Sequence, residues 1–445
     1  MKTIFSETYN PVLNDIFDQV SEGCDVAESA AWAHEAAGQI VKKLASLKIS
    51  VTCSKITIGA TTATVYLTPA EDVRILSFKN IEDDLSMAVG AKCRVIAPVP
   101  NTPFVGVEIP TMHRQPITFA SVQGKGVTEK MNLPVSLGVK TNGDVLGFDL
   151  ADMPHLLVAG ASGQGKSVGL NVIITSLLSA QTPETLNLYL IDPKRVEFAP
   201  YRPLEATGML KSVDTESDMA AITLDCLCYE VDLRYQALQD AGVRKISDYN
   251  KTADEKMPYI VAVVDEFADL MMGPGSKDVE RSMVRIAQLG RAAGVHLIIA
   301  TQRPEAGVIT GLIKANFPSR IAFRTATSID SKIIIDRGGA QQLIGAGDML
   351  MLYNGELTRA QCAFASDDEI RDKVERCVEE FGAITPPPAQ EETPEIEELE
   401  LPLPINTEKL AIMAEAKRRY DAEVFRRKYC RNPFDVFANL FKLKF

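Results

Sequence analysis

The stretch PHLLVAGASGQGKSVGLN, residues 154–171, decides the fold of this chain. It joins the apolar run HLLVAG to a glycine-rich loop, GASGQGKS at 160–167, and then to the helical pattern SVGLNVIITSLLSA. The loop fits G-x-x-x-x-G-K-[ST] in full, and this motif binds phosphate only between a strand and a helix. Both neighbours are present here, so the sequence predicts a phosphate-binding loop.

The residue types in this loop suit a triphosphate. Gly160, Gly163 and Gly165 let backbone N–H groups converge on phosphates. Lys166 adds a positive charge near the β and γ positions, and Ser167 offers a hydroxyl to Mg²⁺. We therefore expect ATP and Mg²⁺ as cofactors. The expected nucleotide-binding residues are Gly160, Ala161, Ser162, Gly163, Gln164, Gly165, Lys166, Ser167 and Val168.

Two later apolar runs end in polar residues that would complete such a site. YIVAVVDEF ends in Asp265 and Glu266, and VHLIIATQ ends in Gln302. Asp265 would hold Mg²⁺ through water, Glu266 would polarise the attacking water, and Gln302 would sense the γ-phosphate. Because ligands bind at the carboxyl ends of parallel strands, we expect these side chains at the same site as the loop.

The pattern along the chain predicts an α/β fold. Between about 130 and 385, strands appear as continuous apolar runs, each followed by a helical stretch, which is typical of a mostly parallel sheet with helices on both faces. Residues before this region mix a helical stretch at 26–47, with Trp32 as a core anchor, and short alternating runs, which predict a small α+β module. The expected domains are therefore 1–125 (small α+β), 126–385 (ATPase), 386–404 (acidic, proline-rich linker) and 405–445 (basic amphipathic helical tail).

Composition restricts the function classes. The net charge of −12 argues against a protein coated in nucleic acid, although it allows a narrow basic channel inside an acidic shell. No apolar run reaches the ~18 residues that span a bilayer, so we expect a cytoplasmic protein without an integral membrane segment. The eight cysteines lack the spacing of a zinc site and are expected to be reduced.

Five segments resemble, in this order, the motor domain of the FtsK/SpoIIIE DNA translocases: PHLLVAGASGQGKSVGLN, LIDPKRVEF, PYIVAVVDEFADLMM, RAAGVHLIIATQRPEAGVITGLIKANFPSRIAF and LIGAGDMLML. PFVGVEIPTMHRQPITF resembles the end of the α domain of the same family. The resemblance covers about residues 45–385. It implies a RecA-like P-loop ATPase domain and a homohexameric ring that moves double-stranded DNA, driven by ATP hydrolysis at subunit interfaces, in chromosome segregation at cell division or in the transfer of mobile-element DNA.

The resemblance also assigns a role to one arginine. By motif matching, Arg291 takes the position of an arginine finger that acts on the neighbouring subunit, and Gln302 takes that of the sensor. Spacing alone favours a different interpretation, in which Arg281, Arg285 and Arg291 are all surface residues of one helix.

The DNA contacts follow from the same matching. The DNA-contacting loops of the family carry basic residues at the positions of Arg303, Ser328 and Lys332. Ser328 departs from that pattern, and Arg324 nearby is a further candidate. The KR pair at 194–195 could face either phosphate or DNA.

Two family features are missing from the pattern of this chain. Full-length members begin with several membrane-spanning helices and end in a winged-helix γ domain, so we expect a soluble, shortened relative without septal anchoring or directional sequence reading. Two other functions stay open. One is a coupling or secretion ATPase recruited by a protein partner through residues 405–445, and the other is a non-hydrolytic scaffold. The tail also fits a solvated helix, a nucleic-acid contact or a membrane surface.

Overall fold

The computed structural model describes residues 26–382, except 60, 79, 100–101, 112–115 and 274. The chain divides into two compact units, each built from segments that are far apart in sequence. Among the described residues, the first unit holds 26–149, 159–177 and 320–366, and the second holds 150–158, 178–319 and 367–382. The predicted linker 386–404 and tail 405–445 lie outside the described residues.

The first unit begins with the expected small α+β module. Its antiparallel sheet has the order β1-β2-β4-β3. The strands are β1 (Val51–Ile58), β2 (Thr62–Pro69), β3 (Arg94–Ile96) and β4 (Val105–Pro110). The helices are α2 (Val26–Ser46), η1 (Ile75–Phe78), α3 (Glu82–Val89) and, after β4, α4 (Phe119–Val122).

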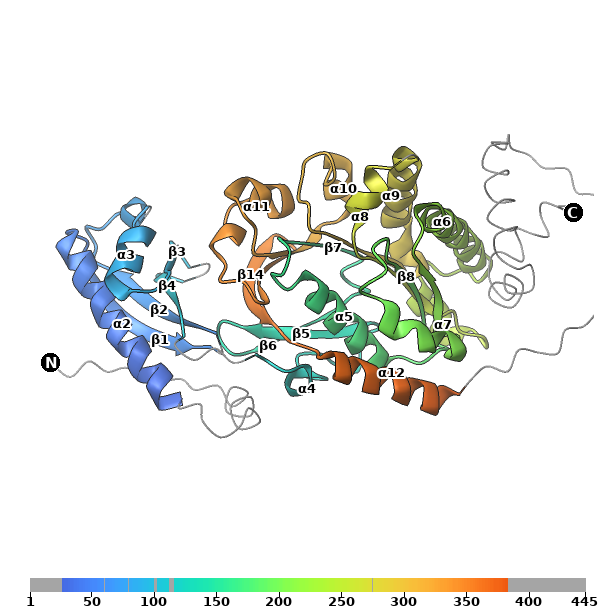
Figure 1. Ribbon diagram of the computed structural model, residues 1–445, viewed down its shortest axis with the longest axis horizontal. Helices are drawn as coiled ribbons and strands as arrows, with labels where there is room; N and C mark the ends of the chain where they lie inside the picture. Colours follow the sequence, from blue (N-terminus) through green and yellow to red (C-terminus); the bar gives the residue numbers. More distant parts are fainter. Residues whose placement is uncertain are drawn as a thin grey trace, which may run out of the picture. The chain divides into compact units, whose positions relative to one another are not determined.

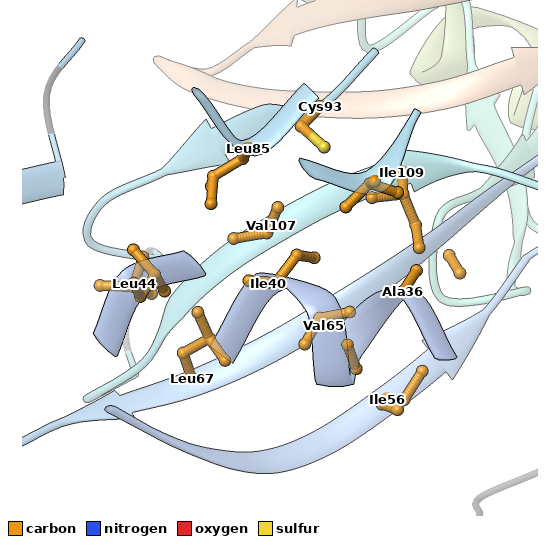
Figure 2. Close-up of a cluster of buried hydrophobic side chains, with 14 of the residues drawn as sticks. Ala36, Ile40, Leu44, Ile56, Val65, Leu67, Leu85, Cys93, Val107 and Ile109 are labelled. Atoms are coloured by element: carbon orange, nitrogen blue, oxygen red, sulfur yellow. The ribbon is translucent and has the colours of Figure 1, made fainter. Parts of the chain in front are cut away.

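The core of this module forms where α2 meets the small sheet (Figure 2). Ala36, Ile40 and Leu44 recur every four residues, so they share one face of the helix and are buried with Val65 of β2. Trp32 packs against this cluster, and its indole Nε1 donates to the carbonyl of Pro110 at 3.1 Å. Trp32 is thus the core anchor that the sequence predicted.

The rest of the first unit contains antiparallel strands in the order β6-β5-β14-β13-β12. They are β5 (Pro134–Lys140), β6 (Val145–Asp149), β12 (Ser319–Phe323), β13 (Asp348–Tyr353) and β14 (Glu356–Cys362), accompanied by α5 (Lys166–Ala180), α11 (Ser328–Ile335) and η3 (Ala340–Gln342). The run RIAFRT was expected among parallel strands, yet β12 pairs antiparallel with β13. β13 and β14 form a hairpin through Asn354 and Gly355, whose positive φ values of 49° and 81° suit a tight two-residue turn.

The second unit, whose strands β7 and β8 are labelled in Figure 1, contains the predicted parallel strands. Their order is β7-β11-β10-β8-β9. They are β7 (His155–Ala159), β8 (Leu186–Ile191), β9 (Leu210–Asp214), β10 (Tyr259–Val264) and β11 (Val295–Thr301). The pairs β10–β11, β8–β10 and β8–β9 are parallel, and β10 and β11 are buried along their whole length, as expected of strands covered on both faces. The helices are η2 (Ala199–Thr207), α6 (Ser217–Asp240), α7 (Ile246–Thr252), α8 (Phe267–Met271), α9 (Ser276–Ala293), α10 (Gly311–Asn316) and α12 (Asp367–Phe381).

None of the helices within the described ranges is long and apolar enough to cross a membrane.

Candidate nucleotide site

The phosphate loop lies in the first unit, at the start of α5. Gly163 and Gly165 have φ values of 73° and 115°, which turn the backbone as a phosphate cradle requires. Lys166 is the first residue of α5 and is only 3% exposed, and Ser167 follows it in the first helical turn. The positive end of the helix dipole therefore faces the loop, and the residues present fit a bound triphosphate.

A second loop supports the phosphate loop from the same unit. The N–H of Gly347 donates to the carbonyl of Gln164 at 3.0 Å, and the N–H of Ala161 donates to the carbonyl of Arg324 at 2.9 Å. A Cβ atom on Gly165 would come within 2.8 Å of Cα of Gly347, so no larger residue fits at 165 without a backbone shift. The LIGAGDML segment and Arg324, which directly follows β12, thus fix the shape of the phosphate loop.

The two acids lie in the second unit, directly after β10, and both are fully buried. The carboxylate of Glu266 accepts a hydrogen bond from Oγ1 of Thr301 at 2.5 Å and from the N–H of Gln302 at 3.2 and 3.1 Å. The structure therefore brings Glu266 and Gln302 together, as the sequence predicted, and adds Thr301 to the group. It is the backbone N–H of Gln302 that donates to Glu266.

The KR pair at 194–195 has partners that the sequence did not indicate. The ammonium of Lys194 lies 3.1 Å from Oε2 of Glu266, so this lysine contacts the acid pair of the site. Arg195 pairs with Glu216, and both of these side chains are 63% exposed. Residues 194 and 266 are too far apart in the chain for a local pattern to reveal their contact.

The three arginines of α9 differ in how firmly they are held. Arg281 and Arg285 pair with neighbouring aspartates at 2.9 and 2.8 Å. Arg291 is 62% exposed and lies 3.9 Å from Asp152. All three are surface residues of this helix, as spacing predicted. The ion pair of Arg291 is longer than those of Arg281 and Arg285, so its guanidinium is the most easily released to another partner.

The candidate DNA-contacting residues are exposed side chains of both units. Arg303, in the second unit, follows β11 and is 52% exposed. In the first unit, Arg324 and Lys332 are exposed, and Ser328 begins α11 one turn before Lys332. Lys92 of the small module is also exposed, and burial followed by the charge of Arg324 lowers its pKa.

Comparison with protein families gives two matches. Residues 121–306 match the model of the FtsK/SpoIIIE family, and residues 17–111 match that of the FtsK alpha domain. The DNA translocase FtsK of Chlorobaculum tepidum is 43% identical over 351 residues, covering 76% of this chain and 44% of the relative. That of Chlamydia trachomatis is 42% identical over 357 residues, covering 76% and 44%. This chain therefore spans less than half the length of these relatives.

Solved structures support the fold. The pCW3 conjugation coupling protein TcpA, in a monomer form with ATPγS, is 25% identical, with a TM-score of 0.55 over 77% of this chain and 99% of TcpA. ATPases 2 and 3 of EssC from Geobacillus thermodenitrificans are 19% identical, with a TM-score of 0.51 over 58% of this chain and 51% of that one. The predicted P-loop ATPase fold is thereby confirmed.

Proposed function

This chain belongs to the FtsK/SpoIIIE family, and from that premise we propose that it is an ATP-driven translocase of double-stranded DNA. One observation carries the proposal. The chain combines a phosphate loop ending in the buried Lys166 with the buried acids Asp265 and Glu266 at the end of a parallel strand. A loop and an acid pair of this kind are the parts that a nucleotide hydrolase needs.

The proposed reaction is hydrolysis of the γ-phosphoryl bond of ATP. The backbone at 163–165 and the ammonium of Lys166 bind the phosphates. Mg²⁺, held by Ser167 and Asp265, would neutralise charge between the β- and γ-phosphates. Glu266 orients a water molecule and takes its proton while the water oxygen bonds to the γ-phosphorus. The bond from that phosphorus to the bridging oxygen breaks, and ADP and phosphate leave.

The proposed assembly is a homohexameric ring working in the cytoplasm, where ATP is plentiful. Arg291 would act on nucleotide bound to the neighbouring subunit, which agrees with its exposure and its 3.9 Å ion pair. Gln302 would sense the γ-phosphate. Arg303, Arg324 and Lys332 would contact DNA phosphates, and such contacts position a protein on DNA without reading its sequence.

Triplex displacement tests this function directly. A stopped-flow assay should show loss of a third strand from duplex DNA only when ATP is hydrolysed, and duplex DNA should stimulate the ATPase. Glu266→Gln should bind ATP and fail to turn it over, which separates a motor from a non-hydrolytic scaffold. Hydrolysis that neither displaces a third strand nor responds to DNA would refute translocation.

A second candidate is a coupling ATPase that moves a DNA–protein or protein cargo. The likeness to the conjugation coupling protein TcpA over 77% of this chain favours it. In this case residues 405–445 would recruit a protein partner. A pull-down with the full chain, compared with a chain ending at residue 404, should then capture a partner only when the tail is present. Translocation by a self-sufficient motor predicts no such difference.

A further inference from the structure

Glu266 is held by a lysine from a neighbouring loop. Its carboxylate is fully buried, whereas the side chain of Lys194 is 38% exposed, and the two meet at 3.1 Å. Thr301 and the N–H of Gln302 donate to the same carboxylate. Both oxygens of Glu266 thus accept hydrogen bonds, and a full positive charge lies beside Oε2.

This arrangement opposes the role proposed for Glu266. A general base must turn a free, negatively charged oxygen toward the water whose proton it takes. A hydrogen bond from an ammonium group is roughly twice as strong as one between neutral groups, so it holds the carboxylate firmly in one orientation. The contact with Lys194 therefore occupies Oε2 of Glu266 and fixes the direction of its carboxylate.

We propose that Lys194 is a positioning residue that restrains Glu266 until duplex DNA draws Lys194 away, so that DNA binding releases ATP hydrolysis. The inference rests on the proposed function and deepens it, because it names the contact through which the DNA substrate would regulate this site.

The loop that carries Lys194 is anchored at its base and exposed at its tip. Oδ2 of the buried Asp192 accepts from the N–H of Glu197 at 2.9 Å and from that of the buried Phe198 at 3.2 Å. Between these anchors, Val196 is 70% exposed and Arg195 is an exposed cation with a positive φ of 62°. The loop can therefore present charges to a ligand and move Lys194 without disturbing β8.

A second segment with a cation reaches Glu266 from the other side. Oγ1 of Thr301, which donates to Glu266, also accepts from the N–H of Arg303 at 2.9 Å. The side chain of Arg303 is 52% exposed. Lys194 holds Glu266 directly, and the backbone of Arg303 holds it through Thr301. Movement of either segment changes the hydrogen bonds of the carboxylate.

These features favour duplex DNA as the ligand. Both segments that hold Glu266 carry exposed cations, namely Lys194 with Arg195 on one and Arg303 on the other. Duplex DNA carries about one negative charge per 1.7 Å of its axis, so one duplex offers phosphates to several cations together. An ammonium bound to phosphate is no longer available to Glu266.

The test compares Lys194→Met with wild type in the full chain, measuring steady-state ATP hydrolysis with and without linear duplex DNA. Methionine keeps an unbranched side chain one atom shorter than that of lysine and removes its charge. We expect DNA-free kcat to rise roughly 5- to 10-fold, because a charge-assisted hydrogen bond to the base is lost. Stimulation by DNA should fall toward one, and KM for ATP should stay within about twofold, since Lys194 contacts Glu266, which is proposed to act on water and not to bind the phosphates.

Two variants serve as controls. Lys251→Met removes an equally spaced surface pair, the 3.1 Å contact of Lys251 with Asp248, and should match wild type. Lys194→Arg keeps the charge and should retain most of the stimulation by DNA. A Lys194→Met protein whose DNA-free kcat falls, whose KM rises severalfold or whose stimulation by DNA is unchanged overturns the inference.

The same measurements distinguish failure of the proposed function from failure of the inference about Lys194. If wild type does not hydrolyse ATP, or if Glu266→Gln hydrolyses it as fast as wild type, the assignment of the site itself is wrong, and the inference fails with it. If wild type hydrolyses ATP, depends on Glu266 and responds to DNA while Lys194→Met behaves like wild type, only the inference fails. Stimulation by an acidic protein and not by duplex DNA would also reject DNA as the releasing ligand.

Discussion

Replacing Glu108 by glutamine should destabilise the first unit. Glu108, in β4 of the small module, is 2% exposed, and its Oε2 accepts from Arg94 at 2.9 Å and from Arg359. Arg359 lies in β14 and also binds both oxygens of Asp348, at 3.0 and 2.6 Å. Two positive and two negative charges therefore balance in a buried cluster, and Glu108→Gln leaves one positive charge uncompensated.

The size of the effect follows from burial. Breaking a buried ion pair by removing one partner costs about 3–5 kcal/mol. The lower end applies here because Arg359 keeps Asp348, and because the side chain of Arg94 is 14% exposed and can reach water. A loss of about 3 kcal/mol lowers the melting midpoint of a 150–250-residue unit by about 6–12 °C. Differential scanning calorimetry of the full chain measures this shift.

A matched control lies in the same module. Asp84 pairs with Lys43 at 3.0 Å, but its side chain is 45% exposed, so Asp84→Asn should cost less than about 1 kcal/mol. If Glu108→Gln melts within about 2 °C of wild type, or no lower than Asp84→Asn, the buried charges are not balanced as argued.

The same carboxylate gives a pH signature. Burial alone would raise the pKa of Glu108, but the charges of Arg359 and Arg94 outweigh burial, so its pKa lies below the ordinary value. The folded state then stays ionised while the unfolded chain takes up a proton. The stabilisation is complete above the ordinary pKa of 4.5 and is lost as pH falls through the folded-state pKa. The difference in free energy of unfolding between wild type and Glu108→Gln should therefore be complete at pH 7 and should shrink as the pH falls below about 4.5.

Three further changes test other parts of the structure. Gly165→Ala should weaken binding of a fluorescent ATP analogue at least ~10-fold, because the φ of 115° and the 2.8 Å approach of Gly347 exclude a Cβ atom. The control is Gly242→Ala, where φ is 67° and a Cβ would meet open space, and this variant should bind the analogue normally. Arg291→Ala should lower kcat by roughly 100-fold or more with ATP binding intact, and Arg285→Ala should stay within about twofold of wild type in the same assay. His155→Asn should reduce acid sensitivity. Burial, followed by the neighbouring imidazole, depresses the pKa of His155 well below 6.5, so below this pH the unfolded chain binds a proton that the folded chain does not. The midpoint of urea unfolding should therefore fall less from pH 7 to pH 5 for this variant than for wild type. An equal fall would show that His155 does not cause the acid sensitivity.

Periodicity and motif chemistry predicted the main elements of the fold. The runs HLLVAG, LNLYLID and VHLIIATQ are strands that end within a residue of the expected position, because uninterrupted apolar runs are what doubly covered strands require. The run YIVAVVDEF also contains a strand, but that strand ends at Val264, before the two acids. The antiparallel hairpin of β13 and β14 was not predicted, although Asn354-Gly355 between two apolar runs is a recognised turn signal.

The buried charged contacts could not be predicted from local sequence patterns, for a different reason. Glu108 and Arg359 lie on strands separated by most of the chain, and no short pattern connects a glutamate in one module to an arginine in another. Burial of Glu108 follows from its place in β4, all of whose residues are buried. A charge at such a position demands a partner, so the sequence could raise the question of a partner but could not name it.

The contact of Lys194 with Glu266 shows which piece of information was missing. The positions of the strands in the sequence do not predict that the loops after β8 and β10 lie next to each other, because β9 lies between these strands in sequence. In space the order is β11-β10-β8-β9, and Ile191 pairs in register with Val264. Lys194 lies three residues beyond the first of these and Glu266 two beyond the second, so their loops leave the sheet side by side. Strand order, which periodicity does not determine, is therefore what brings the ammonium of Lys194 to the carboxylate of Glu266.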